Sequence, residues 1–233
     1  MANRTSVILP VRNGAKFLTE AVASALAQLD AADQLIVVWD LSSDNTAAIV
    51  ASFDDPRVIA VEGPGRGVSA ARNVGLSFAQ GELIAFLDHD DFWPSQRHMI
   101  MRKALADDPQ LDAVFGRMRI QLEPGSTPWK WILELDGRHV PGPNLGTGLF
   151  RRSLLCQIDG FDESLHFGED LDYFDRLKET GMRFGLCEVD GLIYRRHEAN
   201  CTNDQRAVQN STFDVIVRKM ARNRARGGSS GPG

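Results

Sequence analysis

Residues 81–91 read Gly-Glu-Leu-Ile-Ala-Phe-Leu-Asp-His-Asp-Asp. Residues 83–87 are all apolar, which predicts a strand buried on both faces, because a half-exposed strand alternates apolar and polar residues. Three carboxylates, Asp88, Asp90 and Asp91, follow directly. Acids crowded at the mouth of a buried strand repel one another, so a cation is expected to neutralise them.

The expected cation is a hard divalent ion, Mg²⁺ or Mn²⁺, because the available ligands are oxygens. Such ions usually bind one or two carboxylates together with substrate phosphates. Asp88 and Asp90 fit this description, with a diphosphate as the missing partner. The same residues are also typical of a solvated acidic turn before a helix near Ser95, so these positions alone leave both interpretations open.

The composition is that of a globular protein with one sizeable core: 233 residues, 43% hydrophobic and 24% charged. A net charge of −5 gives no reason to expect nucleic acid as a partner. We find neither a run long enough to span a membrane nor a signal-peptide pattern, and we expect a cytoplasmic protein. Cys156, Cys187 and Cys201 are predicted to be free thiols, since they are odd in number and far apart.

Strand-like and helix-like segments alternate through the first half of the chain. Strands are predicted at residues 6–10, 35–39, 58–62 and 83–87, and helices at residues 18–26, 46–53 and 68–80. This alternation predicts an α/β fold with a Rossmann-like, mostly parallel sheet and helices on both faces. Ligands bind beyond the carboxyl ends of such strands, where Arg12, Asn13, Asp40 and the acidic loop are expected to lie.

The second half is less regular. We expect a strand at residues 113–115 and a long connection over residues 122–147. A helix is predicted to open at Asp170, to turn Leu171, Phe174 and Leu177 inward, and to end at Gly181. Two short strands at residues 184–187 and 192–195 and a last helix over residues 204–220 complete the prediction.

Five short motifs follow one another along the chain: residues 8–13 (ILPVRN), Asp40 with residues 42–46, Gly67 with residues 71–73, residues 86–91, and residues 168–170. Together they resemble the inverting GT-A glycosyltransferases of family 2, over residues 4–200. The resemblance implies one GT-A domain at residues 1–222, with a nucleotide-binding half at about 1–120 and an acceptor-side half at about 121–222. Residues 223–233 are expected to form a flexible tail.

The resemblance implies a role for each candidate residue. Nucleotide-sugar binding is assigned to Pro10, Val11, Arg12, Asn13, Asp40, Arg72, Asp88, His89, Gly146 and Thr147. Metal binding, of Mn²⁺ or Mg²⁺, is assigned to Asp88, Asp90 and His197, and catalysis to Glu169 and Asp170, with Asp170 as the base. Trp39 stands where the family usually has an aspartate, so the identity of the nucleotide stays open.

The implied activity is metal-dependent, inverting transfer of a hexose from a nucleotide-diphosphate sugar to a hydroxyl, in glycan or polysaccharide biosynthesis. The acceptor would be a glycan, a lipid-linked molecule or a small molecule. A hydroxyl is a poor nucleophile, so Asp170 would take its proton, while a metal offsets charge on the departing diphosphate. Attack opposite the leaving group inverts the anomeric centre.

Two other functions share the fold or the chemistry. A catalytically silent nucleotide- or sugar-binding module is possible on any such fold, but the presence of Asp170 beside the Asp88 and Asp90 pair argues against it. A nucleotidyltransferase would more naturally carry a glycine-rich, lysine-containing loop where residues 10–13 stand.

Each candidate also has a plain structural interpretation. Asp170 suits a helix N-terminus, His197 a protein surface, Arg72 a surface ion pair and Asn13 a helix cap. Trp129 and Trp131 are predicted to bind the acceptor by stacking, or else to be core residues.

The last predicted helix combines an apolar face with basic residues. Phe213, Ile216, Val217 and Met220 share the face, and the basic residues are Arg218, Lys219, Arg222, Arg224 and Arg226. We expect a docked terminal helix; peripheral contact with the inner face of a membrane is the alternative.

Overall fold

The computed structural model describes residues 3–126, 137–140, 143–200 and 203–227. The strands are β1 Thr5–Val11, β2 Gln34–Trp39, β3 Val58–Glu62, β4 Leu83–Phe86, β5 Ala113–Leu122, β6 His139–Val140, β7 Gly148–Arg151 and β8 Phe184–Arg196. The helices are α1 Leu18–Leu26, α2 Thr46–Ala51, α3 Val68–Phe78, α4 Arg97–Asp107, α6 Arg152–Leu155, α7 Glu169–Glu179 and α8 Gln205–Gly227, with a 3-10 turn, η1, at Leu145–Thr147.

The strands form one sheet in the order β3-β2-β1-β4-β7-β5-β6, with β8 beside β5. Neighbours from β3 to β4 are parallel, as are β5 and β8. β7 runs antiparallel between β4 and β5. The predicted α/β fold with a mostly parallel sheet is therefore confirmed, and the loops after β1, β2 and β4 leave the sheet at the same edge.

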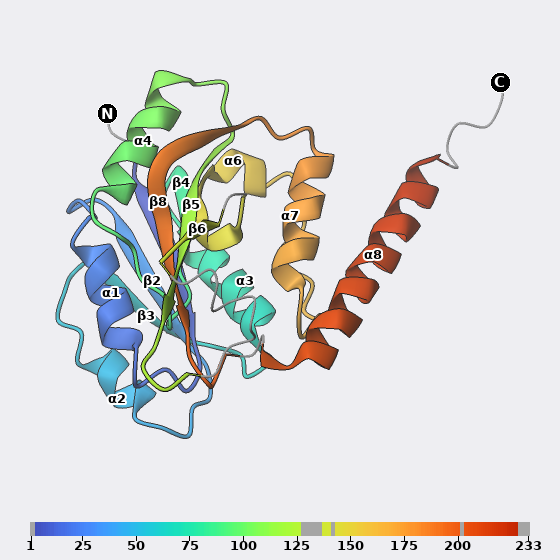
Figure 1. The fold of residues 1–233 in the computed structure, drawn as a ribbon. Helices are drawn as coiled ribbons and strands as arrows, with labels where there is room; N and C mark the ends of the chain where they lie inside the picture. The colour runs from blue at the N-terminus through green and yellow to red at the C-terminus, as the bar shows by residue number, and fades with distance from the viewer. Residues whose placement is uncertain (1–2, 127–136, 141–142, 201–202, 228–233) are drawn as a thin grey trace.

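Helices cover both faces of the sheet (Figure 1). On one face, Val7 and Leu9 of β1 belong to a core that includes residues of α1, α2 and α4. On the other, Ile8 belongs to a core that includes residues of α3, α6 and α7. Because successive side chains of a strand point to opposite faces, a strand between two helical layers must be apolar at every position. This explains the run in β4, whose four residues are all buried, as predicted.

A close approach between α3 and β1 depends on one glycine. A Cβ atom added at Gly75 would lie 2.4 Å from Cγ2 of Ile8, so no larger residue fits without movement. The contact brings α3, and with it Arg72, against the centre of the sheet.

Three details of the second half differ from the prediction. Leu171 is 50% exposed, so its predicted inward position is wrong, while Phe174 and Leu177 are buried as expected. The two short strands predicted after residue 184 are one strand, β8, because its register with β5 shifts around Arg117 and the strand continues through the irregularity. α8 runs to Gly227, past residue 220, where we expected the last helix to end.

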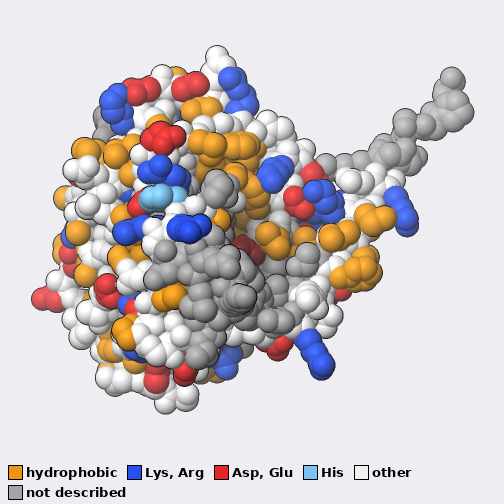
Figure 2. Space-filling model, viewed as in Figure 1, with side chains coloured by type: hydrophobic (Ala, Val, Ile, Leu, Met, Phe, Trp, Pro, Cys, Tyr) orange, Lys and Arg blue, Asp and Glu red, His pale blue; other side chains and the backbone are white. Residues whose placement is uncertain are grey.

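α8 lies beside α7 and projects beyond the body of the molecule (Figure 1). Lys219 and Arg222 pair with Asp175 and Asp172 of α7 at 3.1 and 2.6 Å. These two basic side chains therefore hold α8 against α7, and the predicted docking of the terminal helix is present. Figure 2 shows hydrophobic side chains along the projecting helix, and those of large size and high exposure are Phe213, Ile216, Val217 and Met220. None of the described helices is long and apolar enough to cross a membrane.

Candidate functional site

Asn13 joins the loop after β1 to the loop after β2. Its backbone N–H donates to Oγ of Ser42 at 3.0 Å, and its side-chain oxygen accepts from the N–H of Ser43 at 2.8 Å. Its φ of +52° lies in the left-handed region, which asparagine tolerates better than most residues. Asn13 is not a helix cap, because α1 begins later, after Phe17. Its role is to hold two loops of the sheet edge together.

Asp40 lies in the same edge and is buried. Its Oδ1 accepts from the N–H of Gly65 at 2.5 Å, and its own N–H donates to the Val11 carbonyl at 2.8 Å. Asp40 therefore positions the glycine-rich turn at residues 63–67, which precedes α3. Pro10 and Val11 are buried at the end of β1, whereas Arg12 is exposed.

The acidic loop after β4 lies against the loop after β1. A Cβ atom at Gly14 would meet Cδ2 of His89 at 2.6 Å, so the two loops are in close contact. The predicted convergence of residues 12–13, Asp40 and residues 88–91 on one edge is thus present in the structure.

Arg72 connects this loop to the start of α7. Its Nη2 lies 2.8 Å from Oδ1 of Asp88, and its Nη1 lies 2.7 Å from Oε1 of Glu169. The Arg72 side chain is 5% exposed and the Glu169 side chain 12%, so this pair is buried and is not the surface ion pair of the plain interpretation, whereas the Asp88 side chain is 45% exposed. Asp170, half-buried in the first turn of α7, follows Glu169 directly.

Charge and burial oppose each other at this network. Burial disfavours the charge of Arg72, but the carboxylates of Asp88, Glu169 and Asp170 outweigh it and raise the pKa of Arg72. Burial raises the pKa of Glu169, against the attraction of Arg72. The Glu169 carboxylate is nevertheless engaged by Arg72 at 2.7 Å, so its evident role in this structure is to hold Arg72. Asp170, which no described side chain holds in an ion pair, is the better candidate base.

Asp90 faces His197. Nε2 of His197 lies 3.1 Å from Oδ2 of Asp90, and the side-chain nitrogen of Asn200 lies 3.3 Å from the same oxygen. Burial raises the pKa of Asp90, but the hydrogen bond from His197 and the nearby histidine charges outweigh it, and the net shift is downward. The His197 ring also lies 4.7 Å from that of Phe17. The structure thus places side by side two of the three residues that the resemblance assigns to the metal, Asp90 and His197.

Asp91 and Asn200 have roles that we did not predict from the sequence. Asp91 is buried and accepts from the N–H of Arg195 at 2.8 Å, which fixes the end of β8 beside the acidic loop. Burial raises the pKa of Asp91, and the charges of Asp90 and Asp88 raise it further. Asn200 follows His197 by three residues, and both side chains reach Asp90. This short spacing is the sequence feature from which a role for Asn200 beside His197 could have been inferred.

The three predicted metal ligands do not form one cluster. Among the described residues, no group of three or more histidine, cysteine, aspartate or glutamate side chains is arranged to hold a metal ion. Asp88 pairs with Arg72 instead, because the buried guanidinium needs a counter-charge. Asp90 and His197 still offer an oxygen and a nitrogen at one point, which fits a divalent ion whose remaining ligands come from a substrate diphosphate.

The loop at Gly146 and Thr147 forms η1. Thr147 is fully buried, and its hydroxyl donates to the Asn144 carbonyl at 2.9 Å and accepts from the Asn144 N–H at 3.1 Å. The Thr147 side chain is therefore occupied in shaping the loop, and contacts with a sugar nucleotide would come from the backbone. Trp129 and Trp131, the predicted acceptor-binding residues, lie outside the described residues.

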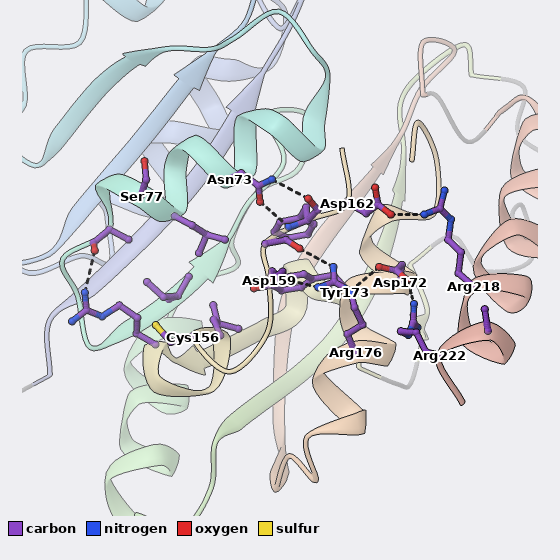
Figure 3. Close-up of a pocket in the computed structure, with 18 residues that line it drawn as sticks. Asn73, Ser77, Cys156, Asp159, Asp162, Asp172, Tyr173, Arg176, Arg218 and Arg222 are labelled. Carbon is purple, nitrogen blue, oxygen red and sulfur yellow. Dashed lines mark hydrogen bonds and ion pairs between the residues drawn. The ribbon is translucent and has the colours of Figure 1, made fainter. Parts of the chain in front are cut away.

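A separate cavity of about 940 Å³ opens between α3, α6, α7 and α8 (Figure 3). Its lining includes Asn73 and Tyr173 but none of the predicted site residues. Asp172 lies at its edge between Arg176 and Arg222, at 2.8 and 2.6 Å. The cavity is bordered by the docked α8 and does not belong to the acidic edge of the sheet. Of the cysteines, Cys156 and Cys187 are free thiols, as predicted, and Cys201 is not described.

Comparisons with known proteins agree with this geometry. The chain is 31% identical to the succinoglycan biosynthesis protein ExoO of Rhizobium meliloti (strain 1021), over 94% of this chain and 72% of that protein. The fold resembles S. aureus TarS 1-349 in complex with UDP-GlcNAc, with a TM-score of 0.69, 22% identity and coverage of 86% of this chain and 61% of that one. It also resembles the mannosyltransferase PcManGT from Pyrobaculum calidifontis in complex with GDP-Man and Mn²⁺, with a TM-score of 0.63, 21% identity and coverage of 87% and 59%.

The pattern of one protein family matches most of the sheet and its acidic edge. This match covers residues 6–161, from β1 to the loop after α6, and so includes Asp40, Arg72, Asp88 and Asp90. Together with the relative and the shared fold, it shows that the chain belongs to glycosyl transferase family 2 and has the GT-A fold.

Proposed function

We propose that the chain is a metal-dependent, inverting glycosyltransferase that moves a hexose from a nucleotide-diphosphate sugar to a hydroxyl acceptor in polysaccharide biosynthesis. The observation that carries the proposal is the network at the sheet edge. Arg72 joins the acidic loop to the helix that begins with Glu169 and Asp170, and Asp90 of the same loop faces His197, which follows β8. The similarity to ExoO, a succinoglycan biosynthesis protein, supports a polysaccharide product.

The donor would lie across the carboxyl ends of β1, β2 and β4. Asp40 and the loop tied by Asn13 would contact the nucleoside, and Arg72 would support the diphosphate side. A divalent ion, when bound at Asp90 and His197, supplies positive charge that stabilises the leaving diphosphate. UDP-GlcNAc and GDP-Man, bound by the two structural neighbours, are the donors to test first.

Asp170 would accept the proton of the acceptor hydroxyl as that oxygen forms a bond to the anomeric carbon. The bond from that carbon to the diphosphate oxygen breaks in the same step, and the nucleotide diphosphate leaves. Because the two oxygens lie on opposite faces of the sugar, the anomeric configuration inverts. Arg72 balances the charge of Glu169, so the carboxylate next to Asp170 in the chain is paired with a cation.

The test has two steps. A panel of nucleotide sugars is screened with Mn²⁺ for a rise in Tm, because a ligand that binds only the folded chain stabilises it. The best donor is then incubated with glycan and lipid-linked acceptors, and the anomeric configuration of the product is read by NMR. Transfer with inversion is expected. Retention of configuration would refute the inverting mechanism, and donor binding without transfer to any acceptor would indicate a silent binding module.

A further inference from the structure

Arg97 is a buried cation without an acidic partner. It opens α4, its side chain is 0% exposed, and none of the ion pairs among the described residues includes it. Burial lowers the pKa of Arg97 to about 9. Burying a guanidinium without a counter-ion is unfavourable unless hydrogen bonds within the protein replace those that it makes with water.

Those hydrogen bonds go to backbone carbonyls of two separate segments. Nε donates to the Gly191 carbonyl of β8 at 2.7 Å, and Nη2 donates to the carbonyls of Gly148 at 2.8 Å and Gly146 at 3.3 Å. The guanidinium also lies 4.0 Å from the centre of the Trp93 ring, which holds it in place. Arg97 therefore clamps η1 and the start of β7 to the middle of β8.

The segments that Arg97 joins pack so closely that two of their neighbouring glycines, Gly116 and Gly191, have no room for a side chain. A Cβ atom at Gly191 would lie 2.9 Å from the Thr147 carbonyl oxygen, and one at Gly116 would lie 2.6 Å from Cα of Gly191. The backbones of β5, η1 and β8 thus pack directly on one another. A forked, planar group with several donors can reach carbonyls of two such segments, whereas an ammonium is a single point charge.

The clamp lies at the functional edge of the sheet. β7 is antiparallel to β4, with Arg151 opposite Leu83 and Phe150 opposite Ile84. Gly148, at the other end of β7, is therefore beside the carboxyl end of β4, which leads into Asp88. η1 also packs against β4.

We propose that Arg97 is a positioning residue for sugar transfer, which fixes the backbone of residues 146–148 at the carboxyl end of β4, where the donor sugar and the acceptor would bind. This inference rests on the proposed function. Arg97 acts through the loop and has no contact with the reacting atoms. Its loss lets the loop shift, so that sugar and acceptor are misaligned while the nucleotide, held at β1 and β2, still binds.

Arg151 provides a matched control on the same strand. Its Nε donates to the Leu111 carbonyl at 2.8 Å and its Nη2 to the Leu105 carbonyl at 2.7 Å, and it too is absent from the ion pairs of the described residues. Arg151 thus clamps the far end of β7, at the edge opposite the acidic loop. Both arginines tie the strand to its neighbours, but only Arg97 lies near the site.

The experiment compares the full-length wild type with Arg97→Met, Arg97→Lys and Arg151→Met. Tm, the Kd of UDP and GDP with Mn²⁺, and kcat and KM for transfer are measured, together with hydrogen–deuterium exchange of residues 143–149. We expect Arg97→Met to lower kcat at least tenfold with nucleotide Kd within twofold of wild type, and to speed exchange in the loop. Arg151→Met should keep kcat within twofold at a similar loss of Tm, and Arg97→Lys should restore part of kcat.

Equal kcat values in Arg97→Met and Arg151→Met would overturn the inference, as would unchanged exchange in residues 143–149. If Arg97→Met does not fold, Arg97→Lys decides: wild-type kcat and exchange would refute a need for the forked geometry. The two proposals fail separately. A wild-type chain that transfers no sugar refutes the proposed function, whereas the exchange measurement tests the clamp without any turnover.

Discussion

Nη1 of Arg72 lies 2.7 Å from Oε1 of Glu169, although the two residues are 97 positions apart in the chain. This contact joins α3 to the first turn of α7. The same guanidinium reaches Asp88, so one buried cation fixes the end of β4 and the start of α7 relative to each other. Through Glu169, the first turn of α7, which also carries Asp170, is tied to the acidic loop by a residue far away in the sequence.

Replacing Arg72 should destabilise the fold. Arg72→Met leaves the buried Glu169 carboxylate without its partner, and the free energy of unfolding should fall by about 3 kcal/mol or more, measured by urea denaturation. Arg66→Met removes an exposed ion pair with Glu163 and should cost less than about 1 kcal/mol. In a double-mutant cycle with Glu169→Met, the two losses should not add; additive losses would show that the pair is not coupled.

Replacing Asp170 should stop turnover without affecting donor binding. Asp170→Asn cannot accept the proton of the acceptor hydroxyl, so kcat should fall by about 10²- to 10⁴-fold while the donor Kd is retained. The control is Asp175→Asn, on the same helix, where the side chain pairs with Lys219. Calorimetry gives the Kd and product release gives kcat. Normal turnover by Asp170→Asn would mean that another group is the base.

Metal binding should depend on Asp90 and His197. At a ligand concentration 100-fold above Kd, Mn²⁺ with a nucleotide diphosphate should stabilise the wild type by about 2.7 kcal/mol. This stabilisation should be lost with EDTA and in Asp90→Asn, and reduced in His197→Gln, because one ligand is removed. Glu198→Gln, next to the site and exposed, should respond like the wild type. Full stabilisation of Asp90→Asn would place the ion elsewhere.

His98 should make the fold less stable in acid. Burial lowers the pKa of His98 from 6.5 to about 3, helped by the charges of Arg97 and Arg102. Below pH 6.5 the unfolded chain binds a proton that the folded chain does not, so the free energy of unfolding falls as pH falls, by up to about 1.4 kcal/mol per pH unit. The loss continues down to about pH 3.

Urea denaturation between pH 7 and pH 4 measures this slope. His98→Gln should make it shallower, because glutamine does not ionise, and the exposed His166→Gln should leave it unchanged. An identical slope in His98→Gln and the wild type would show that His98 is not the titrating group.

The order of elements in the first half could be predicted from the sequence, because it depends on local periodicity. Residues 83–87 are apolar at every position since β4 lies between two helical layers, and β3 was predicted with its observed bounds, Val58–Glu62. The convergence of Asn13, Asp40 and the acidic loop followed from one rule about parallel sheets. In the second half, Leu171 was misplaced because apolar spacing alone does not show which face of a helix is covered.

The sequence by itself determined the α/β fold, the edge that carries the polar loops and the candidate residues, because hydrophobic period and motif order are local properties of the chain. Only the tertiary structure decided how these residues pair. Asp88 pairs with Arg72, Asp90 faces His197, and Arg97 clamps carbonyls of β7 and β8. The physical reason is that a charged group in or near the core pairs with whatever partner the fold brings within hydrogen-bond distance, and these partners lie from 16 to 107 positions away in the chain.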